Sequence, residues 1–369
     1  MKFEPFQLER WLSECRLRCE IDLSSSVITH FKYSELISQE DLNMPVRIGP
    51  TNGHEVLRQK ISELYQGAVD EDSVLVTHGA SEANFLLLNY LIAPRDECIL
   101  VVPNYMQVWG ILRAIGARVK LAYLDENRDY KLDIDGINEL ISKNTKAILV
   151  TNPNNPTGAV LTSDELRGIC DLAKVVHAYV IGDEVLSGLE IDGKRSLSPV
   201  EIYDRGISTR SLSKLGLSGL RVGWVAARDP AVAKGCWRIR DYTSLGSSFF
   251  NQHIAVVALR SLDKIAQRDR EILSERVGTL MNWVKENEEF VICVRPKAGA
   301  TAMVKYKFGI DSTEFCTQLL KEERVAVSPG DYFVVPESFR VLYGTDQSKL
   351  KAALERIHKF LERVQKERS

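Results

Sequence analysis

The chain has 369 residues, of which 44% are hydrophobic, and its 48 lysines and arginines nearly balance its 50 aspartates and glutamates. This length suffices for a large core and for two domains, and the balanced charge lacks the basic footprint of a nucleic-acid-binding protein. Seven cysteines without paired spacing predict neither a disulfide framework nor a metal site. The N-terminus is too polar for a signal peptide, and no apolar run has the length of a membrane span, so we expect a cytoplasmic protein.

Short apolar runs alternate with helical patterns through the first two-thirds of the chain. The runs that predict strands are 73–79, 98–105, 118–124, 147–153, 178–185 and 206–213. Segments 81–93 and 162–177 predict helices, and Thr162 and Glu165 have the spacing of a capping box. Several strand runs are continuously apolar, as is typical of strands covered on both faces. The alternation predicts an α/β fold with a mainly parallel sheet flanked by helices.

The pattern changes after about residue 260. A long charged helical stretch is followed by an apolar run at 300–308 and then by a final helix. One face of that helix carries the apolar residues Leu350, Leu354, Ile357, Leu361 and Val364. We therefore predict a large domain over residues 46–260 and a smaller α+β domain over 261–369. An N-terminal segment, 1–45, is predicted to pack with the smaller domain.

Residues that can bind ligands or take part in catalysis follow the predicted strands. Sites in parallel sheets lie at the carboxyl ends of the strands. In "THGASEA", Gly79 permits a tight turn, and Ser81 with the free amides of the helix start makes an anion site. An ordinary N-cap serine is the alternative for Ser81. In "TNPNNPTG", the prolines hold the loop extended and present Asn155. Asp183 ends an apolar strand, where an unpaired carboxylate is costly, so we expect it to have a cationic partner.

Lys214, in "SLSKLGLSGLRVGW", also follows a predicted strand and should lie beside Asn155 and Asp183. An anion site, a buried carboxylate, an amide donor and a lysine together describe a pocket for pyridoxal phosphate, with Arg221 as a further phosphate ligand. Desolvation and neighbouring positive charge would lower the pKa of Lys214 and make its neutral amine available as a nucleophile and base. The alternative for Lys214 is a solvated loop charge.

At these residues the chain resembles the class I/II aminotransferases of fold type I. The resemblance rests on "GHEVLR", "GASEA", "PNY", "NPNNPTG", "DEV", "SLSK" with "GLRVGW", "VSPGDYF" and "FRVLYG", which occur in this order across most of the chain. It implies a pyridoxal 5′-phosphate enzyme that acts on amino acids and 2-oxo acids. It also implies a homodimer with its sites near the subunit interface, and no metal.

The resemblance implies a role for each matching residue. Lys214 would be the Schiff-base lysine, Asp183 would pair with the pyridine nitrogen, and Tyr105 would stack on the cofactor ring. Asn155 would bond the phenolic oxygen and border the substrate, and Arg340 would bind the substrate α-carboxylate as a planar fork. The expected phosphate ligands are Gly79, Ala80, Ser81, Ser211 and Arg221.

Three features depart from the family pattern. Leu186 stands where many members have a tyrosine that donates to the phenolic oxygen, and Ile48 stands where many have a tyrosine that reaches the partner's phosphate. The stretch from Lys214 to Arg221 is one residue shorter than the common spacing. A lost phenolic donor changes the electronics of the bound cofactor, so reactions other than transamination stay open.

Three functions are therefore compared. The leading hypothesis is an aminotransferase, and the second is an elimination, replacement or cyclising enzyme of specialised amino-acid biosynthesis, similar to capreomycidine synthases. The third is a non-catalytic regulator on a transferase scaffold, against which the intact Lys214, Asp183 and Arg340 argue. The substrate side chain is not evident. Arg238 and Arg240 could face an acidic substrate and Asp241 a basic one, but we interpret all three as a solvated helix face.

Overall fold

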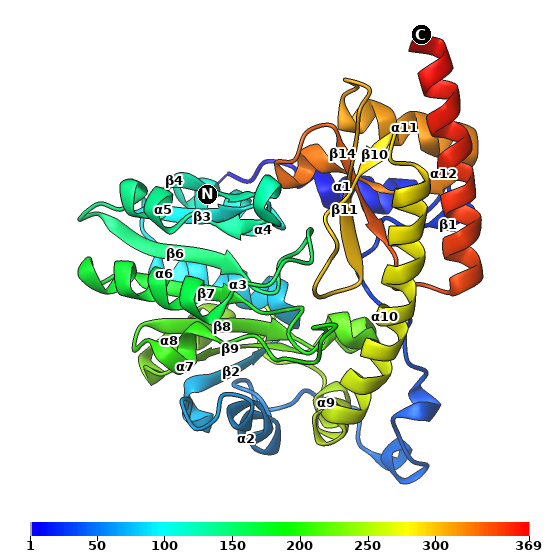
Figure 1. Cartoon of the computed structure of the whole chain (residues 1–369). Coiled ribbons are helices and arrows are strands. Elements are labelled where there is room, and N and C mark those ends of the chain that lie inside the picture. Colours follow the sequence, from blue (N-terminus) through cyan, green and yellow to red (C-terminus); the bar gives the residue numbers. More distant parts are fainter. Residues whose placement is uncertain (1, 369) are drawn as a thin grey trace.

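The computed structural model describes residues 2–368 and contains a large sheet, a small sheet and a two-stranded pair (Figure 1). The large sheet has the strand order β2-β9-β8-β7-β6-β3-β4-β5. Its strands are β2 (Val74–Thr77), β3 (Glu97–Val102), β4 (Arg118–Asp125), β5 (Lys131–Leu132), β6 (Thr145–Thr151), β7 (Tyr179–Asp183), β8 (Gly206–Ser211) and β9 (Gly223–Ala227). Strands β9 and β5 run antiparallel to the other six, so the sheet is mainly parallel as predicted. Each of the predicted strand runs overlaps one of its strands, and β5 and β9 were not predicted.

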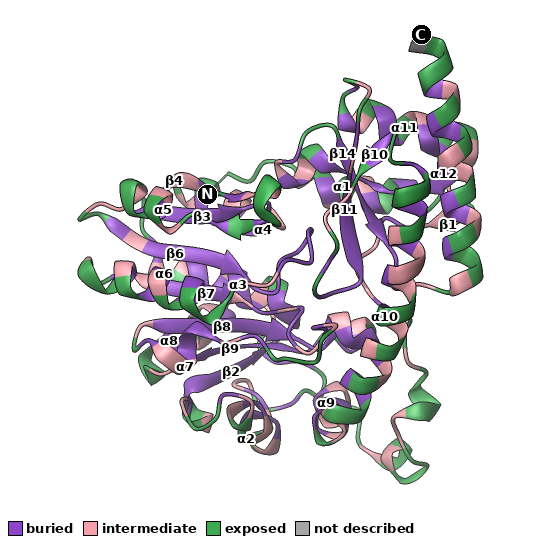
Figure 2. Cartoon of the chain, viewed as in Figure 1, coloured by how far each residue is buried: buried purple, intermediate pink, exposed green. Residues whose placement is uncertain are grey.

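Helices cover both faces of this sheet. One face packs against α3 (Gly79–Leu91), α4 (Gln107–Ile115) and α8 (Pro230–Arg240), and the other against α5 (Ile134–Leu140), α6 (Ser163–Val175) and α7 (Pro199–Ile202). Strand β3 shows why several predicted strands are continuously apolar. Its alternate side chains point to opposite faces, and both faces are buried. Cys98 and Leu100 enter the first of these cores, whereas Ile99 enters the second. Figure 2 shows the central strands buried along most of their length.

The small sheet is antiparallel and has the order β10-β11-β14-β13. Its strands are β10 (Val291–Ile292), β11 (Thr301–Tyr306), β13 (Ser328–Pro329) and β14 (Ser338–Leu342). The helices of this part are α10 (Leu262–Glu286), α11 (Ser312–Glu323) and α12 (Gln347–Arg368). The predicted apolar face of α12 is buried from Leu350 to Val364. Figure 1 shows α10 running from beside α9 (Phe249–Arg260) to the small sheet.

The N-terminal segment lies against the C-terminal part. Its helix α1 (Gln7–Cys15) contacts β13, and its strand β1 (Ile21–Asp22) pairs with β12 (Val325–Ala326). One apolar cluster continues from Leu57 and Trp224 to Phe315 and Leu354, so the two sheets share a core. The boundaries near residues 45 and 260 therefore stay a prediction. The remaining elements are α2 (Glu55–Glu63) and the single turns η1 (Tyr33–Glu35), η2 (Glu40–Asn43), η3 (Glu71–Ser73), η4 (Glu126–Arg128), η5 (Ser213–Leu217), η6 (Ser218–Leu220) and η7 (Gly330–Phe333).

The prediction that the charged residues at the end of α8 form a solvated face is only partly correct. Arg238 and Asp241 are exposed, but Arg240 is fully buried. Its guanidinium donates to the backbone oxygens of Thr51 and Val76, and it forms an ion pair with Glu82 at 3.7 Å. Arg240 thus connects α8 to three other parts of the fold: the loop at Thr51, strand β2 and helix α3. Within residues 2–368, no helix is both long and apolar enough to cross a membrane.

Candidate active site

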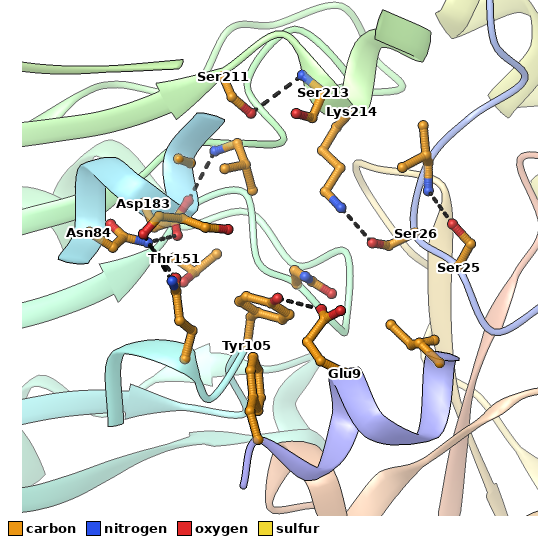
Figure 3. A pocket seen from close by; sticks show the side chains of 18 of the residues that line it. Glu9, Ser25, Ser26, Asn84, Tyr105, Thr151, Asp183, Ser211, Ser213 and Lys214 are labelled. Atoms are coloured by element: carbon orange, nitrogen blue, oxygen red, sulfur yellow. Dashed lines mark hydrogen bonds between the residues drawn. The ribbon is translucent and has the colours of Figure 1, made fainter. Parts of the chain in front are cut away.

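A cavity of about 490 Å³ opens at the carboxyl ends of the central parallel strands. Figure 3 shows Asp183 and Lys214 entering it from the large sheet, and Glu9, Ser25 and Ser26 bordering it from the N-terminal segment. The predicted site residues that line it are Ala80, Ser81, Tyr105, Asn155, Asp183, Ser211, Lys214, Arg221 and Arg340. Gly79 is the one predicted residue outside the lining. Segments separated by more than two hundred residues thus meet around a single space.

One end of the cavity has the features of an anion site. Helix α3 begins at Gly79 with φ +77°, and Ala80 and Ser81 form its first turn, whose amides have no partner within the helix. The positive φ favours glycine at position 79, and a Cβ there would lie 2.7 Å from the Arg221 guanidinium, which would have to shift. Arg221 donates to the backbone oxygen of His78 at 3.2 Å and is otherwise exposed. A helix N-terminus beside an arginine favours a phosphate group.

Asp183 ends β7 and faces the cavity with amide partners. Its Oδ2 accepts from the Asn84 side chain at 3.0 Å, and its Oδ1 accepts from the backbone N–H of Val185 at 3.3 Å. Burial raises the pKa of Asp183, while these two donors and the charge of Lys214 lower it. Among the described residues no cation forms an ion pair with this carboxylate. The cationic partner expected from the sequence is therefore absent from the protein itself, and the carboxylate is free to hold a protonated ligand nitrogen.

Lys214 lies in η5, one irregular turn that follows β8. Its Nζ donates to Ser26 Oγ at 2.7 Å, across the cavity from the large sheet (Figure 3). Burial lowers its pKa to about 8, and the positive charges of Arg340 and Arg221 lower it in the same direction. Among residues 2–368 no carboxylate pairs with Lys214. Close to neutral pH this amine is therefore partly uncharged and nucleophilic.

Arg340, in β14 of the small sheet, is fully buried. It donates to Asn155 Oδ1 at 3.0 Å and to the backbone oxygen of Ser24 at 2.6 Å, and Ser328 Oγ lies at 3.4 Å. Its Nε has no hydrogen-bond partner, and no carboxylate within the described chain pairs with it. Burial lowers its pKa to about 10, so it remains charged at neutral pH. A buried arginine without a counterion is costly, which indicates that an anionic ligand completes the site.

These residues fit pyridoxal phosphate. The helix start and Arg221 match its phosphate, Asp183 matches its pyridine nitrogen, and the weakly basic Lys214 matches its aldehyde. Arg340 lines the cavity without a counterion in the described chain, which leaves a separate place for a carboxylate. The donor set therefore agrees with the cofactor predicted from the sequence.

Two of the three departures from the family pattern are single residues, and they occupy different environments. Leu186 is buried, and it packs so closely against Gly299 that a Cβ there would lie 2.9 Å from Leu186 Cδ1. Ile48 is exposed and forms an isolated bridge with Ser248. Neither residue lines the cavity.

Sequence reasoning missed several cavity residues. Asn84 follows Ala80 by one turn of α3, so the helical period alone was enough to place it on the same side. Glu9 and Ser26 belong to the N-terminal segment, which carries none of the aminotransferase motifs quoted above and reaches the cavity only because the chain folds back over the sheet. Tyr105 was expected to stack on the cofactor. It lines the cavity, and its hydroxyl donates to Glu9 Oε1 at 2.6 Å.

Comparison with known proteins agrees with this geometry. Residues 22–357 match the family model "Aminotransferase class I and II". The chain is 29% identical over 364 residues to capreomycidine synthase of Streptomyces vinaceus, covering 96% of this chain and 93% of that protein. It is 29% identical over 310 residues to aspartate aminotransferase of Thermotoga maritima, covering 83% and 80%. A pyridoxal-phosphate-dependent aminotransferase from Streptococcus suis superposes with a TM-score of 0.92 at 34% identity, covering 99% of both chains.

The fold is that of a fold-type I pyridoxal phosphate enzyme. The chain belongs to aminotransferase class I and II, and its cofactor is pyridoxal 5′-phosphate.

Proposed function

We propose that this aminotransferase moves an amino group between an L-amino acid and a 2-oxo acid, with the cofactor bonded to Lys214. The observation that carries the proposal is the convergence of Lys214, Asp183 and Arg340 on one cavity without protein counterions. Each of these groups is costly to bury unpaired, and each matches a different part of the cofactor–substrate pair.

Bound pyridoxal phosphate supplies an electron sink for the charge left on the substrate Cα when its proton is removed. Lys214 takes that proton on Nζ and returns it, for which its lowered pKa suits it. The carboxylate of Asp183 keeps the pyridine nitrogen protonated. Arg340 binds the α-carboxylate and holds the Cα–H bond toward Lys214. These residues supply orientation and proton transfer.

The remaining residues orient the cofactor. Ala80, Ser81, Ser211 and Arg221 bind its phosphate, and Gly79 leaves room for Arg221 beside the helix start. Asn155 donates to the phenolic oxygen through its amide nitrogen, because its Oδ1 accepts from Arg340. Asn155 thereby links the cofactor to the substrate carboxylate site. Tyr105 stacks on the ring.

A specific observation also favours a second reaction. The similarity to capreomycidine synthase covers 96% of this chain, and Leu186 lacks the phenolic hydroxyl that many aminotransferases have at its position. A cyclising or eliminating enzyme would use the same Lys214, Asp183 and Arg340 for proton removal and then lose a leaving group. Transamination remains the leading function because most of the similar proteins are named as aminotransferases.

One experiment separates these reactions. The purified holoenzyme is incubated with single amino acids without an oxo acid, and the cofactor spectrum and the released products are followed. Conversion to pyridoxamine phosphate with one equivalent of oxo acid supports transamination. Release of ammonia with an unchanged cofactor supports elimination, and a new amino-acid product with an unchanged cofactor supports cyclisation. No change in the cofactor or in any amino acid overturns all three reactions. Borohydride reduction and peptide mapping should place the bound cofactor on Lys214.

We also propose that the enzyme is a cytoplasmic homodimer. A cluster of exposed apolar side chains supports the dimer: Val46, Ile48, Tyr242 and Leu245. The two segments that carry them lie side by side, since Ile48 bridges Ser248 and Gly49 donates its N–H to the oxygen of Ser247. A contiguous apolar patch of this kind typically marks a protein interface.

A further inference from the structure

The proposed function assigns no role to one charged side chain that lines the cavity. The charged residues that line the cavity are Glu9, Arg16, Asp183, Lys214, Arg221 and Arg340. Under the proposed function, Lys214, Asp183 and Arg221 serve the cofactor, and Arg340 serves the α-carboxylate. Arg16 is largely exposed and pairs with Asp22 at 3.3 Å. Only Glu9 then remains.

The fold holds Glu9 firmly at the cavity. It lies on α1, whose Leu8 and Leu12 are buried against Phe333 and Val335. The indole of Trp11 anchors the same helix by donating to the backbone oxygen of Val327 at 2.8 Å. Figure 3 shows the Glu9 carboxylate pointing from this helix toward Tyr105 and the open space. Its position is therefore set by packing and is not that of a mobile surface side chain.

Glu9 has a hydrogen-bond donor but no cation. Its Oε1 accepts from Tyr105 at 2.6 Å, and no lysine, arginine or histidine of the described chain forms an ion pair with it. Burial and the charge of Glu9 raise the pKa of Tyr105 far above its usual range, so Tyr105 stays a neutral donor. The second carboxylate oxygen is left available to a ligand.

The neighbouring positive charges are used elsewhere. Glu9 acts at a distance on both Lys214 and Arg340, whose pKa values its charge raises. In the proposed reaction the amine of Lys214 bonds to the cofactor, and Arg340 is neutralised by the substrate carboxylate. The negative charge of Glu9 is then uncompensated in a partly desolvated wall, which favours a cation on the ligand.

We propose that Glu9 is a specificity-determining residue that binds a cationic group at the end of the substrate side chain. The proposal rests on the proposed function and names its substrate class: amino acids whose side chains end in a guanidinium or an ammonium group. A guanidinium matches a carboxylate through parallel hydrogen bonds. A hydrogen bond to a charged partner contributes enough to change affinity by about 10- to 100-fold.

The first test is a binding measurement that needs no reaction. The probe is δ-guanidinovalerate, which is arginine without its α-amino group, and the neutral probe of the same shape is δ-ureidovalerate. Calorimetry on the holoenzyme should show the guanidino acid binding about 10-fold or more tightly than the ureido acid. Glu9→Gln should remove this difference, because the amide still accepts from Tyr105 but carries no charge. Glu14→Gln removes a charge from an exposed position of the same helix and should leave the difference intact.

The second test compares substrates. L-Arginine and L-ornithine should be converted with higher kcat/KM than L-citrulline and L-norvaline, and Glu9→Gln should lower kcat/KM for the cationic pair only. Equal loss for all four, or equal binding of the two probes by the wild type, overturns the proposal. If no amino acid alters the cofactor while the probes still differ in a Glu9-dependent way, the proposed function is wrong and the cation site stands.

Discussion

The amine of Lys214 illustrates how burial sets reactivity at the scale of one residue. Burial and two nearby arginines lower its pKa to about 8 in the cofactor-free protein, well below the usual value of 10.5 for lysine. The neutral fraction of the amine therefore grows as the pH rises through about 8. We expect the rate of cofactor incorporation by the apoprotein to rise over this range and then level off. Stopped-flow absorbance of the cofactor band measures it, and a rise delayed to about pH 10 would contradict the prediction.

Asn84 is predicted to position the Asp183 carboxylate. Its hydrogen bond lowers the pKa of Asp183 against the effect of burial, and its Oδ1 is fixed by the hydroxyl of Thr209 at 2.7 Å. In Asn84→Ala the pKa of Asp183 should rise, so the carboxylate becomes protonated at a higher pH and no longer holds the pyridine nitrogen. The acid limb of the kcat/KM profile should move to higher pH, with a smaller loss on the alkaline side. Asn89→Ala on the same helix, where the amide bonds only the backbone oxygen of Phe85, should leave the profile unchanged.

Arg340 is predicted to define the enzyme as one that acts on amino acids. Arg340→Lys keeps a positive charge but cannot reproduce the planar fork or all the contacts to Asn155 and Ser24. Loss of one partner of such a desolvated pair costs about 2–5 kcal/mol, and kcat/KM for amino acids should fall accordingly. Amines without a carboxylate should lose much less, and the cofactor band should be nearly unchanged. Equal losses for amines and amino acids would place the carboxylate site elsewhere.

At the scale of the element, α6 depends on its capping box. Thr162 Oγ1 accepts from the N–H of Glu165 at 3.2 Å, and Glu165 accepts in return from Thr162 and also from the N–H of Leu132. Thr162→Ala should lower the free energy of unfolding by about 1 kcal/mol, because one helix donor loses its acceptor. Thr162→Ser keeps the acceptor and should retain most of the stability. Urea denaturation measures both variants, and equal stability of the alanine variant and the wild type would show that the cap contributes nothing.

At the scale of the whole molecule, the exposed apolar cluster formed by Val46, Ile48, Tyr242 and Leu245 predicts self-association. Charges placed in this cluster, as in Val46→Glu combined with Ile48→Glu, should convert the dimer to a monomer, since carboxylates would have to be buried without partners. Tyr123→Glu adds a charge at another exposed aromatic residue, on β4, and should leave the dimer intact. Sedimentation velocity distinguishes the states. A wild-type monomer, or a dimer in the double variant, would contradict the proposed interface.

The large sheet and most of the predicted residues that line the cavity were predictable because they depend on local order in the chain. A strand that is buried on both faces has a continuous apolar sequence, so the sequence alone predicted β3, β6 and β7. Residues that follow parallel strands meet at one edge of the sheet, which brought Asn155, Asp183 and Lys214 together in advance. The antiparallel strand β9 was missed because its small and apolar residues were read only as part of the "GLRVGW" motif.

The sequence by itself determined the family, the cofactor and the mainly parallel sheet, because short contiguous motifs and apolar runs carry this information. Only the tertiary structure decided what closes the cavity. Glu9 and Ser26 reach it because β1 pairs with β12 and α1 packs on β13, contacts between segments about three hundred residues apart. The same holds for Arg240: its sequence pattern predicted an exposed charge on a helix face, but the residue is fully buried in the folded chain. Such positions depend on which distant surfaces pack together, and no local pattern encodes that.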